Sequence, residues 1–161
     1  MSPNITHEKA LILVEQAYRH HMRGDLGQAI ELYQRSIDTH PTAEAHTYLG
    51  WAYGMLQRYD EAIEACKEAI AIDPDFGNPY NDIGSYLIAQ ERWEEALPWL
   101  EQATTAARYE PRHFPYINLG RVYENLGRFR TALDHYDEAL AIDPLDRSAR
   151  WAKYALLGKL N

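Results

Sequence analysis

The sequence predicts an all-α protein, an α-solenoid of antiparallel helix pairs with about nine helices in all. Three observations lead to this prediction. The same types of residue return at steps of 33, 34 and 36 residues along the chain. Within each period the apolar residues follow the 3.6-residue spacing of a helix, and each period closes on a proline. A chain of 161 residues, 46% of them apolar, can bury such a core without a metal or a disulfide.

Four columns of residues carry the repeat, and three of them hold small side chains. The small columns are Ala17, Gly50, Gly84 and Gly120; Ala29, Ala62, Ala96 and Ala132; and Ser36, Ala69, Ala103 and Ala139. The fourth column is bulky: Leu26, Tyr59, Trp93 and Phe129. The closing prolines are Pro41, Pro74, Pro111 and Pro144. Small residues at a helix crossing let two backbones approach closely, so these columns predict tight contacts within each pair.

The elements follow in order from this register. We expect a lead-in over residues 1–9, then four repeats, then a final helix that covers the open end of the last repeat. The repeats are residues 10–42, 43–76, 77–112 and 113–146, and the capping helix is residues 147–161. Repeat arrays commonly need such a cap to stay soluble.

The last repeat shows the helix pair most clearly. An apolar stripe at helical spacing runs from Tyr116 to Leu126 and ends at Gly127, as helices often do. A second stripe runs from Phe129 to Leu140 and stops at Asp143-Pro144. Each repeat is therefore predicted to be two helices joined by a short turn.

The third repeat departs from the regular length. Ala103 to Pro111 spans eight residues, whereas the matching interval from Ala69 to Pro74 spans five. We expect the three extra residues to extend the second helix of this repeat by about one turn. Such an insertion is either tolerated without consequence or changes the local superhelical pitch.

The capping helix is basic although the chain as a whole is acidic. The formal net charge of the chain is −8. Residues 147–161 carry four cationic side chains: Arg147, Arg150, Lys153 and Lys159. The apolar side chains of this segment can face the last repeat, so its outer face is predicted to be a basic spot on an acidic protein.

This pattern resembles the tetratricopeptide repeat family from Leu13 to about Asp146. The last repeat matches all eight signature positions with Tyr116, Leu119, Gly120, Tyr123, Ala132, Tyr136, Ala139 and Pro144. The first repeat departs at Gln16 and His20, and the second at His46 and Cys66. The resemblance implies a right-handed superhelix, a single domain over residues 1–161, and a concave groove, lined by the first helix of each repeat, that receives a peptide or helix of another protein.

The groove candidates lie between the signature positions of the first helices. They are Val14, Tyr18, Met22, Thr47, Trp51, Met55, Asn81, Ser85, Ile117, Asn118 and Arg121. The first two repeats place aromatic rings and methionines where a solvated face would be polar, which is typical of an interaction site. In the later repeats asparagine can bond a peptide group, and arginine can bind a carboxylate through two hydrogen bonds.

One known binding mode of the family is not supported. Some members bind acidic C-terminal tails of heat-shock chaperones with a clamp of two lysines, two asparagines and one arginine. Val14 and Tyr18 stand where the first lysine and asparagine would be, and Thr47 and Trp51 stand there if counting begins at the second repeat.

Several function classes are excluded or disfavoured by the composition. The net charge of −8 argues against binding nucleic acid or an anionic membrane. The lone Cys66 excludes an intrachain disulfide and is interpreted as a small buried residue. His20 and His21 point about 100° apart on a helix, so we interpret them as surface or groove residues rather than metal ligands. We find no catalytic, cofactor-binding or metal-binding constellation, and therefore expect no enzyme and no cofactor.

The partner is expected to be a protein or peptide, and the chain a monomer or a weak homo-oligomer. No secretory signal or apolar span of about 20 residues is seen, so we expect a cytoplasmic location. The leading hypothesis is a non-enzymatic adaptor or scaffold. Two alternatives stay open: a small secretion-type chaperone for one dedicated cargo protein, suggested by Glu110-Pro111-Arg112 before Phe114-Pro115, and a self-assembling scaffold.

Overall fold

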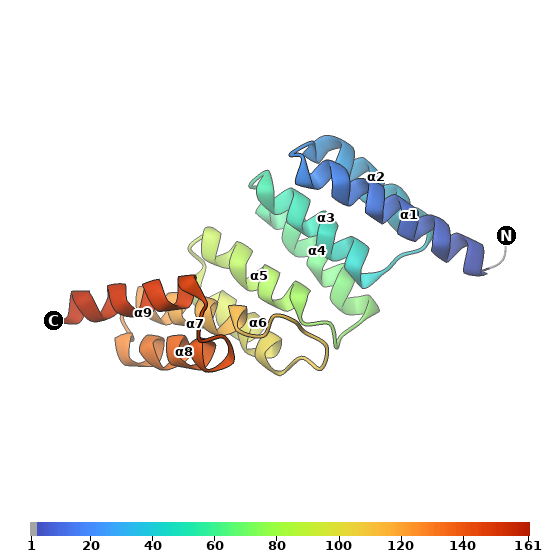
Figure 1. The fold of residues 1–161 in the computed structure, drawn as a ribbon. Helices are drawn as coiled ribbons and strands as arrows, with labels where there is room; N and C mark the ends of the chain where they lie inside the picture. Colours follow the sequence, from blue (N-terminus) through green and yellow to red (C-terminus); the bar gives the residue numbers. More distant parts are fainter. Residues whose placement is uncertain (1–2) are drawn as a thin grey trace. The chain divides into compact units, whose positions relative to one another are not determined.

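The computed structural model describes residues 3–161, and all of its regular elements in that range are helices (Figure 1). The nine helices are α1 (Pro3–Met22), α2 (Leu26–Thr39), α3 (Ala43–Met55), α4 (Tyr59–Ile72), α5 (Asn78–Ala89), α6 (Trp93–Thr105), α7 (Phe114–Asn125), α8 (Phe129–Ile142) and α9 (Arg147–Leu160). The predicted all-α class and the number of helices are confirmed. None of these helices combines the length and apolar character needed to cross a lipid bilayer.

The helices form two compact units, the first ending at Pro74 and the second beginning at Asp75. The first unit holds the pairs α1–α2 and α3–α4, and the second holds α5–α6, α7–α8 and the final helix α9. Each pair matches one predicted repeat, although α1 begins at Pro3, within the expected lead-in. The extent of a single domain over residues 1–161 stays a prediction.

Each helix pair turns through one residue in the left-handed region. These residues are Gly24, Gln57, Glu91 and Gly127, with φ between 57° and 81°. Beyond each of them a backbone N–H bonds back to a carbonyl five residues earlier, as from Arg128 N to Tyr123 O at 2.8 Å. This arrangement satisfies carbonyls at the end of the first helix and reverses the chain. Glycine occupies this position in two of the four turns. In the other two turns Gln57 and Glu91 adopt the same conformation, which is strained for a residue with a side chain.

The small columns lie at the helix crossings, as predicted. Ala29, Ala62, Ala96 and Ala132 are all fully buried. Gly84 and Gly120 leave no room for a side chain: a Cβ on Gly84 would lie 2.3 Å from Leu100 Cδ2, and one on Gly120 would lie 2.2 Å from Tyr136 Cε1. In the third and fourth repeats a bulky residue of the second helix, Leu100 or Tyr136, therefore occupies the space that the glycine leaves open.

The extra residues of the third repeat do not lengthen its second helix, so that prediction is wrong. α6 has 13 residues, one fewer than α4 or α8. The chain instead turns back as an extended segment. Arg108 N donates to Asp75 O at 3.0 Å, and Gly77 N donates to Arg108 O at 2.9 Å. These bonds, together with the burial of Tyr109, compete successfully with another helical turn.

Gly120→Ala should lower the free energy of unfolding by about 2 kcal/mol, because its methyl group must displace the Tyr136 ring from a close-packed crossing. Urea denaturation followed by circular dichroism would measure the change. Gly27→Ala in α2 is the matched control, since a Cβ there meets no atom within 4 Å. Equal stability of the two variants would contradict the crossing argument.

Asp82 of α5 gives the second unit an alkaline sensitivity. Burial raises the pKa of Asp82 from 3.8 to about 7. Stabilisation from the protonated carboxyl is complete below the unfolded pKa and is lost as the pH rises through about 7. We expect Asp82→Asn to lose less stability than the parent between about pH 5 and about pH 8 in urea titrations, with exposed Asp134→Asn as the control. Identical pH profiles of parent and Asp82→Asn would contradict this.

Candidate functional site

The first unit exposes large apolar side chains on α1 and α3, the first helices of its two pairs. Tyr18 and Met22 of α1 are 40% and 59% exposed, and Trp51 and Met55 of α3 are 38% and 51% exposed. Val14 is half-buried beside them. These five predicted groove residues thus lie at or near the surface. We call them the apolar face.

A shallow pocket opens at one end of the apolar face. It has a volume of about 310 Å³ and is lined by Val14, Glu15, Tyr18, Arg19 and Tyr48. The rings of Tyr18 and Tyr48 meet edge to face with centroids 5.6 Å apart. Tyr48 in turn stacks on the buried Tyr33 at 5.9 Å. The exposed rings therefore rest on a rigid aromatic base.

His21 anchors the other end of the apolar face. It is only 1% exposed, so the interpretation of His21 as a surface or groove residue is wrong. Burial lowers its pKa, which favours the neutral ring. Its Nδ1 accepts from the Tyr33 hydroxyl at 3.2 Å, and its Nε2–H donates to Met55 Sδ at 3.1 Å. The Trp51 ring centroid lies 4.2 Å from that of His21, so one buried side chain positions both Trp51 and Met55.

Other predicted groove residues have structural partners instead. Thr47 is buried, and its hydroxyl donates to Ala43 O at 2.7 Å within α3. In the second unit Asn118 Nδ2 donates to Asn81 Oδ1 at 3.0 Å, and both amides are buried. Ile117 belongs to the core of α7, α8 and α9. The residue types at these four positions are compatible with either a binding groove or a structural role. Only the contacts that these residues make show that they are structural.

Ser85 and Arg121 are the exposed groove candidates of the second unit. Arg121 Nη1 reaches Asn118 Oδ1 at 3.5 Å, a long contact that leaves the guanidinium accessible. Arg121 also lines a pocket of about 570 Å³ whose other residues come from α7, α8 and α9: Glu124, Tyr136, Arg147, Ser148, Trp151, Ala152, Ala155 and Lys159. The sequence predicted α9 only as a cap with a basic outer face and did not indicate this pocket.

The floor of this pocket repeats the design seen at His21. The Tyr136 hydroxyl donates to Glu124 Oε2 at 2.9 Å, as the Tyr33 hydroxyl does to His21. In both repeats the tyrosine follows its partner by 12 residues. The corresponding positions of the two middle repeats hold Cys66 and Leu100. At this position a tyrosine hydroxyl of the second helix bonds a polar side chain of the first helix in repeats one and four, and the two middle repeats have no tyrosine there.

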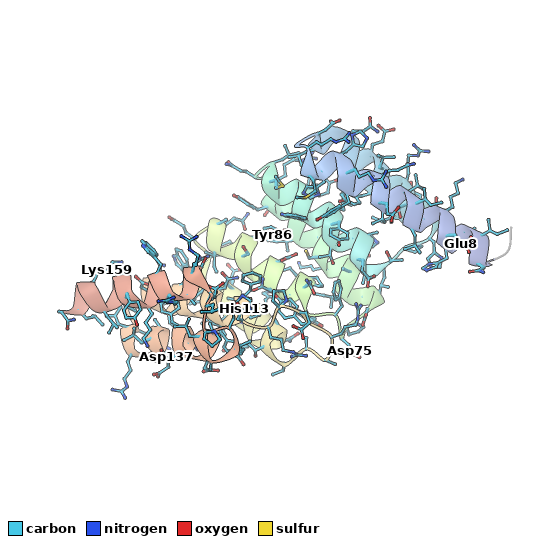
Figure 2. All side chains as sticks on the ribbon, viewed as in Figure 1. Glu8, Asp75, Tyr86, His113, Asp137 and Lys159 are labelled. Atoms are coloured by element: carbon cyan, nitrogen blue, oxygen red, sulfur yellow. The ribbon has the colours of Figure 1, made fainter. Side chains whose placement is uncertain are left out.

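A cluster of His113, Asp143 and Asp146 is accounted for by the local backbone. The candidate ligand atoms of these residues lie within 4.8 Å of one another. Asp146 Oδ1 accepts from Ala149 N at 2.7 Å and caps α9, while Asp143 Oδ1 accepts from Leu145 N at 3.1 Å. His113, which precedes α7, has its Nε2 3.4 Å from Asp146 Oδ2 and so contacts the residue that caps α9 (His113 is labelled in Figure 2).

Helix pairs with small crossing residues and an exposed face on the first helices define a helical-repeat protein. The chain belongs to the tetratricopeptide repeat family: profiles of this repeat match residues 43–76 and residues 75–144, together more than half of the chain. The resemblance stated from the sequence is thereby confirmed, and with it a fold of repeated helix pairs and a role in protein–protein interaction. Members of the family are typically not enzymes.

Relatives with this repeat differ widely. The Type IV pilus assembly protein PilF of Pseudomonas aeruginosa is 26% identical over 122 residues, which cover 75% of this chain and 48% of PilF. Small glutamine-rich tetratricopeptide repeat-containing protein 2 of Mycosarcoma maydis is 34% identical over 74 residues, or 45% of this chain and 21% of that protein. The chain thus spans less than half the length of either relative.

A solved structure confirms the fold. The structure of Pseudomonas aeruginosa PilF superimposes with a TM-score of 0.89 and 24% identity, covering 96% of this chain and 70% of that chain. At this level of identity the likeness establishes the arrangement of helices and leaves the partner open.

The buried His21 should make the first unit sensitive to acid. Because its folded pKa lies below the ordinary value of 6.5, the unfolded chain binds the extra proton as the pH falls below 6.5. Stability is therefore present above that pH and is lost below it, at a slope of up to about 1.4 kcal/mol per pH unit. Burial lowers the pKa of His46 as well, so His46 adds to the same trend.

Urea titrations at about pH 7.5 and about pH 5.5 would test this. His21→Phe should lose less stability on acidification than the parent, even if it is less stable at the higher pH. His20→Gln is the control, because His20 is partly exposed and bonds Asp25 at 3.0 Å. An unchanged pH dependence in His21→Phe would refute the assignment.

Proposed function

We propose that this chain is a non-enzymatic adaptor or scaffold that holds a peptide or helix of a partner protein against the first helices of its repeats. The observation that carries the proposal is the apolar face of the first unit. Solvent-exposed clusters of tryptophan, tyrosine and methionine are costly in a soluble protein unless a partner covers them. Tryptophan and tyrosine also contribute disproportionately to binding energy at interfaces.

The preorganisation of the apolar face supports the same proposal. His21 fixes Trp51 and Met55 through contacts of 4.2 Å and 3.1 Å. Rings that are already in place lose little conformational entropy on binding. Met22 adds a flexible side chain that can adapt to apolar surfaces of different shape. A partner that presents an apolar edge, from an extended segment or an amphipathic helix, fits this combination.

The second unit supplies a polar complement. Ser85 and Arg121 offer exposed hydrogen-bond donors, whereas the buried Asn81 and Asn118 support the helices from which they project. We therefore restrict the proposed contact residues to Val14, Tyr18, Met22, Trp51, Met55, Ser85 and Arg121.

Three further forms of this function remain distinct hypotheses. The similarity to a type IV pilus assembly protein favours a role in assembling a larger protein machine. The proposal of a secretion-type chaperone requires one dedicated cargo, and the proposal of a self-assembling scaffold requires contact between copies. Light scattering over a range of concentrations separates the last from the others, because a constant monomer mass excludes self-assembly.

Trp51→Ala and Arg121→Glu should each weaken capture of the partner from native cell extract by about tenfold, the loss expected when a central contact is removed. Circular dichroism should remain unchanged, since both side chains are exposed. Matched controls are Ile72→Ala, an exposed apolar residue at the end of α4, and Arg130→Glu on α8. Parent-like binding by both test variants would show that the exposed faces of the first helices are not the binding site.

A further inference from the structure

The helix α9 exposes two aromatic rings to solvent. Trp151 is 76% exposed and Tyr154 is 62% exposed. Trp151 lines two pockets. One is the pocket of about 570 Å³ shared with α7 and α8, and the other, about 440 Å³, is lined by Arg147, Arg150, Trp151, Tyr154 and Ala155. Both volumes fall in the range of pockets that hold ligand groups.

The cations around Trp151 divide into paired and available ones. Lys153 binds Asp137 of α8 at 2.6 Å, and Lys159 binds Glu124 of α7 at 2.9 Å (Asp137 and Lys159 are labelled in Figure 2). Within residues 3–161, Arg147 and Arg150 make no ion pair with a carboxylate. Two guanidinium groups thus flank an exposed indole on a chain whose net charge is −8.

The larger pocket has its one carboxylate already neutralised. Glu124 Oε2 accepts from the Tyr136 hydroxyl and Oε1 accepts from Lys159 Nζ, each at 2.9 Å. With both oxygens engaged, the electrostatics of the pocket are set by Arg121 and Arg147, which line it from α7 and α9. An entering carboxylate would meet two cations that can each offer a pair of donors.

We propose that this pocket binds a partner segment in which one or two carboxylates flank an apolar or aromatic side chain. The carboxylates bind Arg121 and Arg147, and the apolar side chain packs on Trp151 against Ala152 and Ala155. The inference rests on the proposed protein-binding function and adds to it the chemistry of one contact. It places the carboxylates in the fourth repeat and α9, whereas Val14, Tyr18, Thr47 and Trp51 leave the early repeats without such a site.

The charge pattern favours a short acidic protein segment over a nucleic acid. Arginine beside an aromatic ring also suits a nucleic acid, but a continuous phosphate backbone needs an extended basic track. The chain as a whole carries a net charge of −8, which repels long polyanions. A short segment with few carboxylates meets the local attraction and little of the general repulsion.

The test begins with selection of random peptides displayed on phage against the wild-type chain. We expect the enriched peptides to combine aspartate or glutamate with leucine or an aromatic residue. Fluorescence anisotropy of the labelled peptides then measures binding to variants. Arg147→Glu and Trp151→Ala should each weaken binding by about tenfold or more, and added salt should weaken it further. Arg130→Glu, the same charge change on exposed α8, should bind like the parent.

Several outcomes would overturn the proposal. These are no enrichment, enriched peptides without acidic residues, or binding that survives Arg147→Glu and Trp151→Ala. Binding of labelled oligothymidine that Arg147→Glu abolishes would assign the face to nucleic acid. Sedimentation that shows association of the parent and not of Arg147→Glu would assign it to a second copy. Peptide binding lost only in Trp51→Ala would leave the proposed function standing and remove this inference alone.

Discussion

The close approach of the two helices in each pair is the constraint on which the rest of the structure depends. At Gly84 and Gly120 the facing side chains, Leu100 and Tyr136, fill the space where a Cβ would otherwise lie. The repeated alanine of each second helix is fully buried as well. The crossing buries one face of each first helix. Residues on another face of that helix can therefore be exposed to solvent. The surfaces proposed for partner binding therefore follow from how the core of the protein is packed.

The two units use this exposed face differently. In the first unit the buried His21 and Tyr33 support tryptophan, tyrosine and methionine, which makes an apolar surface on a neutral base. In the second unit Glu124, Tyr136 and Lys159 form a charged network beneath Arg121, Arg147 and Trp151. One repeat architecture thus presents two chemistries, suited to different parts of a partner or to different partners.

Most of the fold could be predicted from the sequence because repetition is a local signal. The spacing of small and apolar residues places each helix after α1 within a few residues, and the crossing columns proved to be fully buried. The loop at residues 106–113 could not be predicted, because its extended path depends on backbone bonds to Asp75 and Gly77. His21 and the pocket beside α9 escaped for a related reason. Their roles depend on side chains from neighbouring helices, which periodicity along one helix does not reveal.

The tyrosine hydroxyls that reach the first helices make the four repeats unequal. Tyr33 and Tyr136 each hold a polar side chain in the last turn of the preceding helix, whereas the matching positions of the middle repeats are Cys66 and Leu100, which carry no phenol. Substitutions on the first helices of the middle repeats can therefore occur without leaving a buried tyrosine hydroxyl unpaired. In the end repeats they cannot, because a change at His21 or Glu124 removes the partner of a buried phenol. Recombination that shuffled whole repeats would keep the backbone of this protein and lose the support beneath both of its proposed contact surfaces.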